Sequence, residues 1–118
     1  MGQVIEINQK RFFTLDEARG LLPIVRRITR ESFEEVKKIT AQLGFANERE
    51  QRTVLEKRVQ DIFQSWHSKM VKLGCEAKGM WLVDFDSGDG YYCWQYPEPD
   101  IEYFHGYFEG FRGRIRIQ

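Results

Sequence analysis

The sequence predicts an α+β fold in which a long antiparallel helical hairpin is packed with a small antiparallel sheet of three to four strands. Two long stretches with helical periodicity, joined by a short turn, predict the hairpin. After Gly74 the composition shifts to aromatic and turn-forming residues, which predicts the sheet. We expect one domain over 1–118, with the hairpin at 14–73, the sheet at 79–117, and residues 3–13 as a strand that could join it.

The first helix has clear start and stop signals. Thr14 and Glu17 have the spacing of a capping box, in which each side chain accepts a hydrogen bond from the other residue's backbone N–H. Apolar residues then recur at helical spacing as far as Leu43, and Gly44 is a typical C-cap. Pro23 lies inside this pattern and removes one backbone donor, so we expect a kink or a split there.

The second helix has an apolar stripe with steps of three and four residues that ends at Gly74. The stripe consists of Leu55, Val59, Ile62, Trp66, Met70 and Leu73. Helices of about 25 residues are longer than the predicted sheet can cover at 1.5 Å per residue. We therefore expect a homodimer in which two hairpins form a four-helix arrangement.

Three segments, 81–86, 91–96 and 101–106, predict a meander, and 113–117 is a candidate closing strand. The segment that begins at Asp84 is similar to a calcium loop, but Gly88 occupies the third ligand position, Asp89 the invariant glycine position and Gln95 the twelfth position, so we interpret 84–90 as a hairpin turn. We assign most of the aromatic residues, including Trp81, Phe85 and Trp94, to the core.

Composition narrows the partners and the cellular compartment that we expect for the chain. The 18 basic and 18 acidic residues balance, so no overall field attracts nucleic acid, although Arg112, Arg114 and Arg116 alternate along the tail. Two cysteines are too few for a disulfide scaffold. No stretch is apolar enough to span a membrane. We expect a cytoplasmic protein without a nucleic-acid or membrane partner.

Several short motifs resemble an uncharacterised prokaryotic family, "domain of unknown function 2203". They are FTLDEA and LLP at Phe13–Ala18 and Leu21–Pro23, and LVDF, CW, Glu98, Ile101, Tyr103–His105, GF and GR from Leu82 to Arg114. The chain departs from the family pattern at Trp81, where Gly is usual, and at Phe104, where Trp is usual. The resemblance implies a prokaryotic source and this layout of helices and sheet, and it supplies no activity.

Polar residues within the apolar sheet region are the candidate site, because a buried charge is costly unless it is paired or used. The ligand-binding candidates are Asp84, Tyr92, Trp94, Glu98, His105 and Arg114, and Cys93 with His105 are metal-ligand candidates. If Asp84 pairs near Tyr92, then Asp84, Tyr92 and Trp94 share one face of the sheet and Cys93 lies on the other. The sequence leaves open on which face of the sheet His105 lies.

Three interpretations remain open, and no reaction or cofactor is assigned. In the first, the polar residues only satisfy one another and the chain is a non-catalytic interaction protein that self-associates through its hairpin. In the second, Asp84, His105 and Arg114 bind a small anionic ligand or substrate. In the third, Cys93, His105 and a carboxylate bind a metal.

Overall fold

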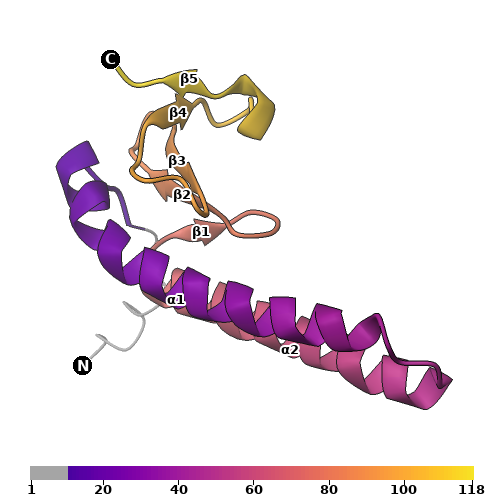
Figure 1. Cartoon of the computed structure of the whole chain (residues 1–118). Helices are drawn as coiled ribbons and strands as arrows, with labels where there is room; N and C mark the ends of the chain where they lie inside the picture. Colours follow the sequence, from indigo (N-terminus) through magenta and orange to yellow (C-terminus); the bar gives the residue numbers. More distant parts are fainter. Residues whose placement is uncertain (1–10) are drawn as a thin grey trace, which may run out of the picture.

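A computed structural model describes residues 11–118, so most of the candidate strand at 3–13 lies outside the described part (Figure 1). Two long helices are followed by a sheet that sits against one end of the helical pair, and the other end projects away from it. The described elements are α1 (Leu15–Leu43), α2 (Arg49–Lys72), β1 (Glu76–Ala77), β2 (Leu82–Asp86), β3 (Tyr91–Gln95), β4 (Tyr103–His105), the 3₁₀ helix η2 (Phe111–Gly113) and β5 (Ile115–Arg116).

Helix α1 begins with the predicted capping box. The Thr14 N–H donates to Glu17 Oε1 at 2.9 Å, and the Glu17 N–H donates to Thr14 Oγ1 at 3.1 Å. Gly44 is the C-cap, as predicted. Pro23 lies within one continuous helix, and the first turns of α1 bend away from the rest in Figure 1. Proline therefore kinks this helix without splitting it.

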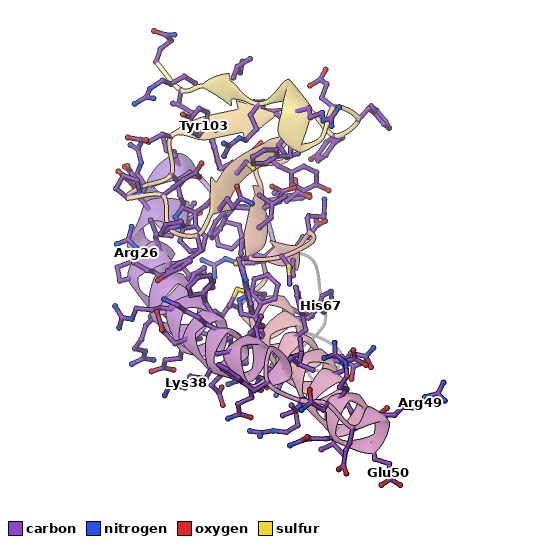
Figure 2. All side chains as sticks on the ribbon, turned by 45° about the vertical axis from the view of Figure 1, so that its right-hand side comes forward. Arg26, Lys38, Arg49, Glu50, His67 and Tyr103 are labelled. Carbon is purple, nitrogen blue, oxygen red and sulfur yellow. The ribbon has the colours of Figure 1, made fainter. Side chains whose placement is uncertain are left out.

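Helix α2 packs antiparallel along α1 and forms the predicted hairpin (Figure 1). Midway along α1, the Thr29 hydroxyl accepts a hydrogen bond from the buried Trp66 indole N–H, with 2.9 Å between Oγ1 and the indole nitrogen. At the free end, Leu55 of α2 packs with Ile39 and Ala46 in a small second core. Figure 2 shows Arg49 and Glu50 projecting from this end, far from Tyr103 in the sheet.

The sheet is an antiparallel meander of five strands in the order β1-β2-β3-β4-β5. It has one strand more than the three to four predicted, because Glu76 and Ala77 pair with Asp84 and Val83. The sheet therefore begins at residue 76, before the expected start at 79. Arg112 lies in η2, and β5 contains only Ile115 and Arg116, so the tail arginines do not share one strand.

The pairing of β2 with β3 differs by one residue from the predicted register. Asp84 lies opposite Cys93, and Phe85 lies opposite Tyr92. The turn explains the shift, because Ser87 N–H donates to the Gly90 carbonyl at 2.8 Å and closes a loop over 87–90. The predicted grouping of Asp84 with Tyr92 and Trp94 is wrong, because side chains alternate between faces along a strand.

One face of the sheet packs against the helices. Val83, Phe85 and Trp94 from this face join Val25 of α1 and Trp66 of α2 in the main core, and Tyr92 packs against it. Two long-range contacts fix the start of α1 to the sheet region. Phe13 N–H donates to the Asp86 carbonyl at 2.7 Å, and the Arg19 guanidinium donates to the Ile101 carbonyl at 2.9 Å.

Candidate functional site

The opposite face of the sheet brings together three side chains from three neighbouring strands. Asp84 of β2, Cys93 of β3 and His105 of β4 are 2%, 0% and 3% exposed. The segment after β4 covers this face, because the Tyr107 hydroxyl donates to Asp86 Oδ1 at 2.6 Å and its ring packs on Tyr91. A buried cluster of an acid, a thiol and an imidazole results.

The orientation of His105 is set by its two hydrogen-bonding contacts. Its Nδ1 lies 2.8 Å from the Gly106 carbonyl oxygen. A carbonyl oxygen can only accept, so Nδ1 is the protonated, donating nitrogen. Nε2 faces the Asp84 carboxylate, at 3.2 Å from Oδ1 and 3.1 Å from Oδ2.

Cys93 completes a set of three potential metal ligands. One ligand atom from each of Asp84, Cys93 and His105 lies within 4.8 Å of the others. Burial raises the pKa of the Cys93 thiol to about 12, with a further rise from Asp84 and a smaller opposing effect of Arg114. Without a metal, the buried group is therefore a neutral thiol at neutral pH.

Gly90 allows β4 to lie close to the turn before β3. A Cβ atom at this position would lie 2.5 Å from the Phe104 ring and 2.7 Å from the His105 carbonyl oxygen. Both distances are too short for a real side chain, so the absence of a side chain at Gly90 permits the observed position of His105.

Lys78, in the turn between β1 and β2, is a direct partner of Asp84. Its Nζ lies 3.2 Å from Asp84 Oδ2, 3.6 Å from Glu76 Oε1 and 4.3 Å from the centre of the Tyr91 ring. Burial lowers the pKa of Lys78, but the charges of Asp84, Tyr91 and Glu76 outweigh this effect, and the net pKa is raised. Lys78 is therefore an ammonium ion beside a buried carboxylate.

Arg114 and Glu98 pair with each other beside this cluster. Arg114 Nη2 lies 2.9 Å from Glu98 Oε2, and Arg114 Nη1 lies 4.0 Å from Cys93 Sγ. The guanidinium is also sandwiched between the rings of Tyr103 and Phe111, at 4.0 Å and 4.2 Å. The Arg114–Glu98 pair therefore borders the cluster at Cys93.

The remaining predicted site residues, Tyr92 and Trp94, lie on the helix-facing side of the sheet. Trp94 is fully buried and donates its indole N–H to the Glu98 carbonyl at 2.9 Å. Neither residue therefore lines the polar cluster. The candidate set divides into the Asp84, Cys93 and His105 cluster, the Arg114–Glu98 pair and two core aromatics.

Lys78 and Glu76 are the cluster's neighbours that sequence reasoning missed. They belong to a two-residue strand and the turn after it, and a segment this short has no measurable periodicity. The only available signal was the alternation of Glu76 and Lys78 just before the strand that contains Asp84.

Comparisons with known proteins add one finding. A search of curated proteins and a search of solved structures each found no match to this chain. Within residues 11–118, neither helix has a stretch apolar and long enough to cross a membrane. A scan against family models matches residues 11–117 to a family described as "Uncharacterized conserved protein (DUF2203)". Because this match covers nearly the whole sequence, the chain belongs to the DUF2203 family.

Proposed function

We propose that this protein binds a divalent transition-metal ion of the zinc class through Asp84, Cys93 and His105. The orientation of His105 supports this function most directly. With the proton on Nδ1, the lone pair of Nε2 points at the Asp84 carboxylate from 3.1 Å. Two acceptors face each other at this distance only when a cation, either a proton or a metal ion, lies between them.

Two further features favour a metal over a proton. Cys93 Sγ belongs to the same set of ligand atoms within 4.8 Å, and sulfur, imidazole nitrogen and carboxylate oxygen are the usual ligands of zinc. The hydrogen bond from Nδ1 to a backbone carbonyl is the usual way in which proteins orient a metal-binding histidine. A bound metal would displace the thiol proton of Cys93.

The same geometry argues against the alternatives. A nucleophilic cysteine needs an accessible thiolate, whereas Cys93 is fully buried and its pKa is raised to about 12. An anionic ligand would have to compete with Glu98 for Arg114 and with Asp84 for Lys78. Metal binding uses Asp84, Cys93 and His105 in the positions in which they lie, and it displaces only the contact of Lys78 with Asp84.

Metal titration of the tag-free protein tests the proposal, with Zn²⁺ and Co²⁺ as probes. We expect one equivalent to bind, and a thiolate-to-cobalt absorption band that requires Cys93. Cys93→Ser should lose this band and bind the metal at least about tenfold more weakly. Cys75→Ser is the matched control, because Cys75 is an equally buried free thiol outside the cluster. Less than a tenth of an equivalent bound to the unmodified protein would rule the function out.

We also propose that the protein self-associates through the free end of its hairpin. A groove of about 500 Å³ lies there, lined by Gln42, Phe45, Gln51, Val54 and Leu55. Phe45 and Val54 are 86% and 60% exposed. Charges of both signs, such as Arg49 and Glu50, surround this end (Figure 2), so a two-fold pairing can set opposite charges against each other.

Light scattering at high micromolar concentration tests self-association. We expect twice the 14.1 kDa chain mass, and a return to the single-chain mass in Phe45→Ser. Phe108→Ser is the matched control, because Phe108 is 99% exposed in the segment after β4. A single-chain mass for the unmodified protein would contradict the proposal.

We further propose a cytoplasmic location, which the two free buried thiols of Cys75 and Cys93 support. Cell fractionation should recover the protein with cytoplasmic markers. Recovery from a secreted or membrane fraction would contradict this location.

A further inference from the structure

The geometry points to Lys78 as an internal counter-ion that holds the metal site in its metal-free form and is exchanged for the metal. This inference rests on the proposed metal-binding function. It explains how a buried carboxylate and its two neighbours can exist preformed in a folded chain. It also predicts reversible metal uptake without coupled folding.

Asp84 needs a positive partner when no metal is bound. The carboxylate is 2% exposed, and an unpaired charge at such a position is strongly destabilising. Lys78 Nζ lies 3.2 Å from its Oδ2. In the metal-free protein, where a proton lies between His105 Nε2 and Asp84, Lys78 supplies further positive charge to the buried carboxylate.

Lys78 has other partners to which it can move when a metal binds. A divalent ion between Asp84 and His105 repels an ammonium ion a few ångströms away. Lys78 already has a second carboxylate in reach, since its Nζ lies 3.6 Å from Glu76 Oε1, and the Tyr91 ring lies 4.3 Å away. These partners allow the ammonium to leave Asp84 while it keeps another favourable contact.

Lys78 lies between the buried Asp84 carboxylate and solvent. The Lys78 side chain is 41% exposed, whereas Asp84, Cys93 and His105 are all buried. Among the described residues that contact Asp84, Lys78 is thus the one that reaches solvent. Its movement opens the carboxylate to an incoming ion.

Lys78→Met tests the inference, because it removes the charge and keeps an apolar stem. In chelator competition, we expect Zn²⁺ and Co²⁺ to bind on the order of tenfold more tightly than to the unmodified protein. The metal-free variant should melt at a lower temperature, and saturating metal should restore much of that loss. Lys78→Arg, which keeps the charge, should bind metal no more tightly than the unmodified protein.

Lys57→Met is the matched control, because Lys57 pairs with Asp61 on the exposed surface of α2. Its metal affinity should equal that of the unmodified protein. Unchanged or weaker affinity in Lys78→Met, or a variant that stays unfolded with metal present, would overturn the inference while the metal function stands. If neither the unmodified protein nor Lys78→Met binds metal, the proposed function itself fails.

Discussion

Trp81 combines a left-handed backbone with a dense aromatic environment. Its φ of +63° is unusual for a residue other than glycine. Its indole stacks on Phe63 with centroids 4.9 Å apart and packs edge-on against Trp66. In this chain the aromatic contacts offset the backbone strain.

Replacing Trp81 with Gly should therefore destabilise the protein, although it relieves the strained backbone. A glycine in the left-handed region relieves about 1 kcal/mol of backbone strain, whereas removing a buried tryptophan side chain costs about 3–5 kcal/mol. We expect a net loss of about 2–4 kcal/mol in the free energy of unfolding, measured with urea. Trp81→Phe should lose less. Equal or greater stability in Trp81→Gly would show that the stacking contributes little.

The buried thiol of Cys75 makes the free energy of unfolding of the protein depend on pH. Burial raises the pKa of this thiol from 9.0 to about 12, although Arg11 opposes the rise. A thiol whose pKa is higher in the folded protein than in the unfolded protein stabilises the fold. This contribution is complete at pH values below the pKa of the unfolded state, and it is lost as pH rises towards the pKa of the folded state. The sensitive window therefore runs from about pH 9 to about pH 12.

Cys75→Ser should change this alkaline behaviour. At neutral pH we expect the variant to be about 1 kcal/mol less stable, because a buried hydroxyl replaces the thiol. Above pH 9 the unmodified protein should lose up to about 1.4 kcal/mol per pH unit relative to the variant, because its Cys75 thiol ionises in the unfolded state but not in the folded state. Urea unfolding at several pH values measures the difference. A constant difference up to pH 11 would contradict the role of Cys75.

Among the elements, the two helices are held in register by one buried polar contact. Thr29 is fully buried and accepts the Trp66 indole N–H at 2.9 Å. The surrounding residues of the main core are apolar. Since a buried donor without an acceptor is costly, this hydrogen bond favours one alignment of α1 against α2.

Thr29→Val should leave the Trp66 donor unpaired and destabilise the protein by about 1–3 kcal/mol. Thr40→Val is the control, because Thr40 lies on the exposed side of the same helix. It should change stability by less than about 0.5 kcal/mol. Thermal unfolding compares the two variants, and equal losses would mean that the Thr29–Trp66 hydrogen bond contributes no more to stability than an exposed hydroxyl does.

Long elements with repeated signals were predictable from the sequence, but short ones were not. The capping box at Thr14, the end of α1 at Gly44 and the hairpin are all confirmed. Strand β1 has two residues and no readable pattern. The β2–β3 register depended on hydrogen bonds of the 87–90 turn, including Gly88 N–H to Asp86 Oδ1 at 2.9 Å.

That register also limited what could be predicted of the candidate site. Asp84 and His105 were both identified as candidates, but a shift of one residue decides which partners share their face. The structure pairs Asp84 with Cys93 instead of Tyr92. The residue types thus indicated which chemistry the site could support. Which side chains lie on the same face of the sheet depended on the conformation of the 87–90 turn.

At the scale of the whole molecule, metal binding should add to a fold that already exists. A ligand that binds only the native state stabilises it by about 2.7 kcal/mol at 100 times its Kd. We expect Zn²⁺ to raise the melting temperature by several degrees, and a chelator to reverse this without loss of secondary structure. Circular dichroism during chelation measures both. Unfolding on metal removal would mean that Lys78 cannot sustain the metal-free form.

The meander order of the sheet has a consequence for how the chain folds. Each strand pairs with its neighbour in sequence, and the two helices are also consecutive, so most loops closed during folding are short. Contacts such as Arg19 with Ile101 join residues 82 positions apart. We therefore expect the hairpin and the meander to form as separate local units, and their docking to be the slow step that commits the chain to its native state.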